Sequence, residues 1–330
     1  MANVGDVARR AGVSIATVSR VLNGTAVVAE DTRERVLKAA ADLYYTPNRA
    51  ARNLRAGRSN TVAFAVSDIE QSEVAAIAKY LQPTLQTIGL DCILYSLAHS
   101  GDRLMRLLRE AEQFGVSAVV IVSPDLADEG ELAGHAARLA GLGIRVIAVN
   151  NDRSHLGIAS VLHDDVAATA LSVGHLIANG RVPVAYLGRH AGSRAGQARR
   201  QGYVTALQAA GLPVDPDLTW DFAYRSAAGY EAVDRALARG LAFAAIQCGS
   251  DELAMGAIAA LQDHRIRVPE DVAVVGFSNS PWAMYLRPAL TTLSSSPQHL
   301  ALAVRDLLSG QGEMPLRTLI RRDFLRRSSA

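Results

Sequence analysis

The sequence predicts two structural parts, an all-α unit of three short helices at the N-terminus and a larger α/β region built on two parallel sheets. Up to about residue 46, apolar residues recur at the spacing of short amphipathic helices. From residue 60 onward, short apolar runs rich in β-branched residues alternate with segments of helical composition. The 330 residues, 49% of them hydrophobic and 20% charged, suffice for two or three globular domains.

Charge is distributed unevenly along the chain. Residues 1–58 contain ten Arg or Lys against five Asp or Glu, whereas the remainder is mildly acidic. A basic head on an acidic body favours contact with nucleic acid at one end only. No apolar run approaches the roughly 18 residues that span a bilayer, so we expect no membrane contact and a cytoplasmic location. Cys92 and Cys248 lie in strand-like apolar runs, which is typical of buried reduced thiols.

The first helix should carry Val7, Ala8 and Ala11 on one side and end at Gly12. Glycine tolerates the left-handed backbone of a tight turn, so a second helix can start soon afterwards. Ser14 stands where the N-cap of this second helix should be, because its hydroxyl can accept from a free amide of the first turn. The spacing predicts two helices joined by a tight turn.

The second helix has two unlike faces when its residues are placed at about 100° each. Its predicted core face carries Thr17, Val18, Val21 and Leu22. Its other face presents Ile15, Ala16, Ser19, Arg20 and Asn23. Small side chains beside a single arginine favour close approach to a partner, and a DNA major groove is one such partner.

A third helix follows and completes the small core. Its predicted buried stripe consists of Val36, Leu37, Ala40, Leu43 and Tyr44. Three helices of this length can bury one another's apolar faces, so the head should fold as a compact unit.

Two series of apolar runs predict two parallel sheets. The first series consists of residues 61–66, 90–96, 117–123 and 144–149, and the second of residues 182–188, 241–247 and 271–277. Buried parallel strands have this continuous apolar pattern, with helical crossovers between them. Ligands of such sheets collect at the carboxyl ends of the strands, so a cleft between two lobes should gather both sets of loops.

Catalytic and metal-binding motifs are not found in the sequence. It contains no His-Glu-x-x-His, no phosphate loop ending in Gly-Lys-Ser/Thr, no Gly-x-Ser-x-Gly and no Gly-x-Gly-x-x-Gly after the first strand. His163 beside Asp164 and Asp165 fits a metal site, but it fits better a helix N-terminus, which favours negative charge. We therefore expect no catalytic residue, no metal and no enzymatic activity.

These residues resemble the lactose-repressor (LacI) family of bacterial transcription regulators. The resemblance is carried by DVA, AGVS and TVSRVLN in the head, YTPNRAARNLRAG at residues 45–57, and RRQGY, SDELAMGAI and VPEDVAVVGF farther on. It extends over essentially the whole chain and implies a helix-turn-helix domain at 1–46, a hinge helix and linker at 47–59, and an effector domain at 60–330. That domain should resemble a periplasmic sugar-binding protein. It should divide into an N-lobe of about 60–163 with 292–318 and a C-lobe of about 164–291 with 319–330.

The resemblance also implies which residues contact double-stranded operator DNA. They are Ser14, Ile15, Ala16, Thr17, Ser19, Arg20, Asn23, Thr32, Asn48, Ala51 and Leu54. Leu54 holds the position of the hinge leucine that enters the minor groove, where an apolar wedge can unstack a base step. Ile15 and Ala16 can sense only thymine methyl groups and shape, so Arg20 should supply much of the polar readout. Ala29 stands where relatives often have a serine before the third helix, which removes an N-cap hydroxyl.

An effector site follows from the same resemblance. Its residues are Ser67, Asn150, His163, Arg199, Tyr224, Asp251, Ser278 and Asn279. Arginine and carboxylate groups suit a small polar ligand, here a sugar or sugar acid, and no cofactor is implied. Sugar-binding relatives frequently carry carboxylates at the positions of Asn150 and Ser278, so their loss favours the sugar acid.

The resemblance implies a homodimer that represses carbohydrate-related genes, with operator affinity changed by effector binding. Whether the effector releases the repressor or acts as a corepressor stays open, and so does the choice between a dimer, which we favour, and a tetramer. Two other classes of protein remain as alternatives. An exported binding protein fits residues 60–330 but has no use for the N-terminal helices, and an α/β enzyme acting on sugars needs a nucleophile, base or cofactor loop.

Overall fold

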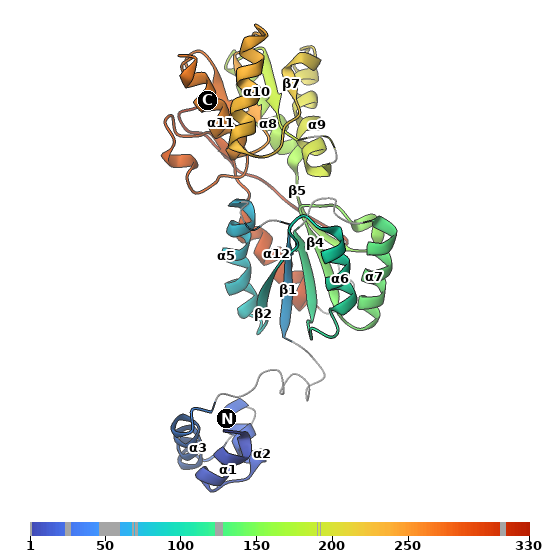
Figure 1. The fold of residues 1–330 in the computed structure, drawn as a ribbon, viewed down its shortest axis with the longest axis vertical. Helices are drawn as coiled ribbons and strands as arrows, with labels where there is room; N and C mark the ends of the chain where they lie inside the picture. Colours follow the sequence, from blue (N-terminus) through green and yellow to red (C-terminus); the bar gives the residue numbers. More distant parts are fainter. Residues whose placement is uncertain are drawn as a thin grey trace. The chain divides into compact units, whose positions relative to one another are not determined.

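The computed structural model describes residues 2–23, 28–45, 60–67, 69, 72–122, 128–189, 191, 193–310 and 315–330. Its chain divides into two compact units, Met1–Ser59 and Asn60–Ala330 (Figure 1). The expected hinge helix with Asn48, Ala51 and Leu54 lies outside the described residues, as does the side chain of Asn23.

The N-terminal unit contains three helices within its described residues: α1 Val4–Ala11, α2 Ile15–Asn23 and α3 Glu30–Asp42. Asn3 and Asp6 form a capping box at the start of α1, and Gly12 ends this helix with a left-handed φ of 65°. The Oγ of Ser14 accepts a hydrogen bond from the amide of Thr17 at 3.1 Å. The predicted turn and N-cap are therefore confirmed.

The core of this unit is formed by all three helices, with Val7, Val18 and Val36 fully buried. Two predicted core residues of α3 were wrong. Leu37 is 47% exposed and Tyr44 is 95% exposed. The buried stripe of α3 runs through Val36, Ala39 and Ala40, so Leu37 points away from it, and Tyr44 lies beyond the helix end with a left-handed φ of 47°.

The larger unit contains a six-stranded parallel sheet in the order β11-β5-β4-β3-β1-β2. Its strands are β1 Thr61–Val66, β2 Asp91–Ser96, β3 Ala118–Val122, β4 Arg145–Val149, β5 Ala159–His163 and β11 Arg317–Ile320. One face is covered by α5 Ser72–Gln86 and α12 Pro297–Ser309, the other by α6 Gly101–Glu110 and α7 Glu129–Gly141 (Figure 1). The four strands expected in this stretch are present. We call these elements the six-stranded half.

A four-stranded parallel sheet follows in the order β7-β6-β8-β9. Its strands are β6 Val184–Leu187, β7 Thr219–Trp220, β8 Ala245–Cys248 and β9 Ala273–Val275. Helices α8 Asp165–Ala178 and α9 Arg194–Ala209 cover one face, and α10 Ser226–Ala238 and α11 Asp251–Asp263 cover the other. We call these elements the four-stranded half.

The chain passes between the two halves three times. The first passage is at Asp164, which joins β5 to α8. The second contains β10 Thr292–Leu293, before α12, and the third contains β12 Phe324–Leu325, after β11. β10 and β12 pair with each other in antiparallel orientation. Three 3-10 turns, η1 Ser154–Leu156, η2 Pro216–Leu218 and η3 Ala283–Tyr285, lie in connections. β5 ends at His163, two residues before α8 begins, and β4 is paired with β5. The carboxyl ends of both strands therefore lie beside the four-stranded half.

Both cysteines are free thiols, with Cys248 buried and Cys92 half-buried, and burial raises the pKa of Cys92 to about 11. Among the described residues, no helix combines the length and apolar character that a membrane crossing needs.

Candidate functional sites

The outward face of α2 is the candidate DNA-contact surface. Ile15 is 50% exposed, Ala16 and Arg20 are exposed, and Ser19 is half-buried. Val18 on the opposite side is fully buried, so the rotation of the helix is fixed by the core. The structure thus places the short apolar residues and the single arginine on one accessible ridge.

Ser14, Thr17 and Thr32 are engaged within the unit. The hydroxyls of Ser14 and Thr17 lie 2.9 Å apart and share a hydrogen bond at the start of α2. Thr32, in the first turn of α3, accepts from Nη2 of Arg35 at 3.3 Å. Ala29 provides no side-chain cap to α3, in agreement with the missing hydroxyl noted in the sequence.

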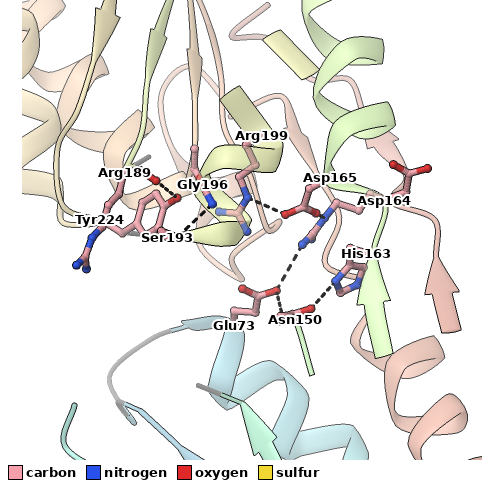
Figure 2. A network of polar contacts seen from close by, with 12 residues as sticks. Glu73, Asn150, His163, Asp164, Asp165, Arg189, Ser193, Gly196, Arg199 and Tyr224 are labelled. Atoms are coloured by element: carbon pink, nitrogen blue, oxygen red, sulfur yellow. Dashed lines mark hydrogen bonds and ion pairs between the residues drawn. The ribbon is translucent and has the colours of Figure 1, made fainter. Parts of the chain in front are cut away.

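In the larger unit, two buried arginines share one carboxylate. Asp165 at the start of α8 accepts from Nε of Arg199 at 3.0 Å through Oδ2 (Figure 2). It also accepts from Nε of Arg322 at 2.7 Å through Oδ1. Both guanidinium groups also stack on the ring of Phe277, at 4.0 and 4.4 Å from its centroid. Burial alone would raise the pKa of Asp165, but Arg322 and Arg199 hold it at about 2. The carboxylate is therefore ionised and fixes both arginines.

A hydrogen-bond chain extends this cluster into the six-stranded half. Glu73 on α5 lies 3.7 Å from Nη2 of Arg322 and accepts from Nδ2 of Asn150 at 3.1 Å. Asn150 follows β4 with a left-handed φ of 59°, and its Oδ1 lies 2.7 Å from Nδ1 of His163 (Figure 2). Because Nδ2 donates to a carboxylate, Oδ1 must accept, so His163 carries its proton on Nδ1. Its Nε2 is buried without a hydrogen-bond partner among the described residues.

Burial, followed by the positive charge of Arg322, lowers the pKa of His163 to about 3. The unfolded chain has a histidine pKa near 6.5, so the folded state binds fewer protons between these two values. The contribution of the neutral ring to the free energy of unfolding is therefore fully present above pH 6.5. We expect the free energy of unfolding to fall by about 2 kcal/mol as pH falls from 7 to 5.

The test is urea unfolding at pH 7, 6 and 5 for the wild type and His163→Gln. The variant should lack this part of the decline. His264→Gln is the matched control, since His264 is exposed and paired with Asp234, and it should retain the wild-type slope. Equal slopes in His163→Gln and the wild type would refute a neutral buried His163.

Asp251, Ser278 and Asn279 lie close together but are engaged with the protein. Asp251 has no exposed surface, and its oxygens accept from the hydroxyl of Thr292 at 2.6 Å and the amide of Ser280 at 2.5 Å. Burial raises its pKa to about 6. Asn279 accepts from Nη2 of Arg327 at 2.7 Å. These contacts tie the segment after β9 to α11 and β10, so Asp251 has no free oxygen for a ligand in this arrangement.

Tyr224 contacts the network in the four-stranded half, and Ser67 lies at the end of β1 in the six-stranded half. Ser67 is buried after β1, with its amide donating to the carbonyl of Val122 at 3.2 Å. The Tyr224 ring lies 5.6 Å from the guanidinium of Arg199, and its hydroxyl donates to the carbonyl of Arg189 at 3.3 Å (Figure 2). Of the predicted residues, hydrogen bonds and ring contacts link Asn150 with His163 and Arg199 with Tyr224.

Sequence reasoning missed three charged members of the network, Glu73, Asp165 and Arg322. Asp164 caps α8 through the amide of Ala167 at 3.0 Å and Asp165 lies in the first turn, so the predicted helix start is confirmed. The sequence does not predict the pairing of Asp165 with two buried arginines. Among the described residues, no group of His, Cys, Asp or Glu could hold a metal ion.

The chain combines a helix-turn-helix unit with two α/β halves around a buried polar network. This combination defines the class of DNA-binding regulators that carry a domain of the ligand-binding type. Residues 3–48 match the model of bacterial regulatory proteins of the lacI family, and residues 173–318 match a periplasmic binding protein-like domain.

Relatives are similar over nearly the full chain. The HTH-type transcriptional regulator RegA of Clostridium saccharobutylicum is 33% identical over 93% of this chain and 91% of its own. The HTH-type transcriptional repressor PurR of Pasteurella multocida is 26% identical over 93% of this chain and 91% of its own. The chain belongs to the lacI family of bacterial regulatory proteins and is a DNA-binding transcription regulator.

Solved structures show the same fold. The Lac repressor bound to ONPG in its repressed state matches with a TM-score of 0.88 and 24% identity, covering 100% of this chain and 99% of that one. The complex of the transcriptional regulator CelR with cellobiose matches with a TM-score of 0.71 and 27% identity over the whole of both chains.

Proposed function

We propose that this regulator is a cytoplasmic homodimeric repressor whose operator affinity changes when a small polar effector binds between the two halves of residues 60–330. Residues 1–46 would read the operator, 47–59 would form the hinge, and the lobes would follow the boundaries expected from the sequence. The observation that carries the proposal is the buried network of Arg199, Asp165 and His163, which lies where the carboxyl ends of β4 and β5 meet α8.

The charge balance of the network supports a neutral polyhydroxyl ligand over the sugar acid that the sequence favoured. Arg199 and Arg322 are offset by Asp165 and Glu73, so the four groups carry no net charge. A buried carboxylate ligand would need an unpaired cation to offset its desolvation. The unpartnered Nε2 of His163 is an acceptor that a ligand hydroxyl can satisfy. The CelR complex with cellobiose is in keeping with this class of ligand.

A homodimer is supported by the edge of the six-stranded sheet and by the geometry of operators. The edge strand β2 leaves two large apolar side chains exposed, Ile93 at 59% and Leu94 at 46%, which a second copy of the chain can cover. A solved structure of a Lac repressor dimer bound to operator matches this chain with a TM-score of 0.86 at 24% identity. Two α2 helices related by a twofold axis can read the two halves of a near-palindromic operator.

DNA binding is tested by selecting duplexes from a random pool and measuring their affinity by fluorescence anisotropy. With 6–10 phosphate contacts, affinity is expected to fall by about 10³–10⁵ between 50 and 200 mM salt. Failure to enrich any duplex would refute the proposed function.

Effector binding is tested by thermal shift with matched pairs of neutral sugars and their aldonic acids. In a pair of which one member binds, the neutral sugar should raise the melting temperature of the wild type. Asn150→Ala should lose the shift because it removes the contacts to Glu73 and His163. Asn179→Ala, at the exposed C-cap of α8, is the surface control. Stabilisation by the acids alone would contradict the neutral-ligand assignment.

A further inference from the structure

Glu129, at the first turn of α7, is shared by cationic groups from both halves of residues 60–330. Its Oε1 accepts from Nη1 of Arg153 at 2.7 Å, and its Oε2 lies 3.1 Å from Nε2 of His155, both within the six-stranded half. The same Oε1 accepts from Nη2 of Arg194, the first residue of α9 in the four-stranded half. One carboxylate therefore joins the two halves directly.

Both partners are placed by capped helix starts. Asp128 caps α7 by accepting from the amide of Glu131 at 3.0 Å, and Ser193 caps α9 by accepting from the amide of Gly196 at 3.1 Å. Glu129 and Arg194 each stand directly after their cap, so the two helix starts are linked. The buried Arg153, with its side chain 5% exposed, anchors Glu129 to its own half.

Helix α9 packs closely against its neighbours in the four-stranded half at two glycines. A Cβ at Gly196 would meet the carbonyl oxygen of Arg189 at 1.5 Å, and a Cβ at Gly202 would meet that of Val166 at 2.3 Å. This close packing joins α9 to β6 and α8 as one body. Arg199, five residues after Arg194 on α9, moves with that body. A displacement of Arg194 relative to the six-stranded half therefore also displaces Arg199 and Asp165.

We propose that Glu129 and Arg194 form a clasp, a pair of positioning residues that stabilises the arrangement of the two halves in which α9 presents Arg199 to the effector site. This inference rests on the proposed function, because the clasp regulates the site where the effector would bind. The side chains are 40% and 46% exposed, so the clasp can open and close without unfolding of either half. Its rupture shifts the balance of lobe arrangements and thereby both effector and operator affinity.

The test compares Arg194→Glu with the matched control Arg225→Glu. Arg225 is exposed at the start of α10 in the same half and is without a side-chain cap bond. Spin labels at Gln113→Cys and Gln208→Cys, in a Cys92→Ala and Cys248→Ala background of the full chain, report the distance between the halves. Arg194→Glu should shift or broaden this distance distribution, and Arg225→Glu should leave it as in the wild type.

Operator affinity supplies a second readout through a double-mutant cycle of Glu129→Gln and Arg194→Gln. Each single variant should change operator affinity by about two- to fivefold, the range of partly exposed ion pairs, and the double variant should change it no further. Additive effects, or an unchanged distance distribution in Arg194→Glu, would overturn the clasp. A wild type that binds no DNA would instead overturn the proposed function, since the distance measurement needs neither DNA nor ligand.

Discussion

Asp165→Asn is expected to lower the free energy of unfolding of residues 60–330 by about 3–5 kcal/mol. The substitution keeps the volume of the side chain but removes the charge that Arg199 and Arg322 share, and the side chains of both arginines are at least 92% buried. Glu73 would then be the one carboxylate of the network left for two buried guanidinium groups, which both lie within 4.4 Å of the Phe277 ring centroid. This cost is far above that of an ordinary surface substitution.

Urea unfolding followed by the fluorescence of Trp220 and Trp282, the chain's two tryptophans, measures the loss in the full chain. Asp164→Asn is the adjacent control, because Asn caps a helix as well as Asp and the bond to the amide of Ala167 is retained. A loss below about 1 kcal/mol in Asp165→Asn, similar to the control, would show that the carboxylate does not hold the arginines.

The same carboxylate predicts the behaviour in acid. Its folded pKa of about 2 lies below the unfolded value of about 3.9, so its contribution is fully present above pH 4 and is lost as pH falls towards 2. Asp251, whose pKa is raised to about 6, acts with the opposite sign and favours the folded state as pH falls through 6. The two contributions are separated by comparing Asp165→Asn and Asp251→Asn with the wild type in urea unfolding between pH 2 and 7.

Arg20→Ala is expected to weaken operator binding by about 1–3 kcal/mol, or roughly 5- to 150-fold, and to relax specificity at the bases it contacts. Arg20 is exposed on α2 beside Ile15 and Ala16, whose side chains can neither donate nor accept hydrogen bonds. Polar discrimination on this ridge therefore depends strongly on the guanidinium group. Anisotropy titrations against a selected operator and single-base variants of it measure both affinity and specificity.

Lys38→Ala on α3 is the control for this prediction, since it removes one exposed positive charge from the same unit without touching the ridge of α2. It should change affinity equally for all duplexes, as the loss of a general electrostatic contact does. If Arg20→Ala binds every duplex as the wild type does, α2 does not read bases through Arg20.

Strands and turns with strong local signals could be predicted from the sequence. The continuous apolar runs of β1, β3 and β4 correspond to parallel strands that are buried except at the first residue of β1 and of β4. Gly12 and Ser14 predict the turn before α2. β5 carries Ser160 between apolar residues, and β11 begins with the polar residues Arg317 and Thr318. Both strands are held by pairing in the sheet, so their local signals are weak. Leu37 and Tyr44 were misplaced because the phase and end of α3 depend on packing against α1 and α2.

The candidate effector site was predictable where a residue follows a strand or matches a family motif, as for Asn150 and Arg199. Glu73, Asp165 and Arg322 were missed because each looks like an ordinary surface charge in its own segment. They meet only through the three passages of the chain between the halves, which bring Arg322 into contact with Asp165, 157 residues away, and with Glu73, 249 residues away. Asp251 matched a motif as expected, yet its oxygens are used by Ser280 and Thr292.

Reciprocal linkage is the most direct test that a ligand site in residues 60–330 controls DNA binding by the N-terminal unit. Operator affinity is measured with and without the stabilising sugar, and sugar affinity is measured with and without operator. Coupled sites must change each other's affinity by the same factor, typically about 5- to 150-fold. An equal factor in both directions is the predicted result. A sugar that binds the chain and leaves operator affinity unchanged would contradict allosteric control.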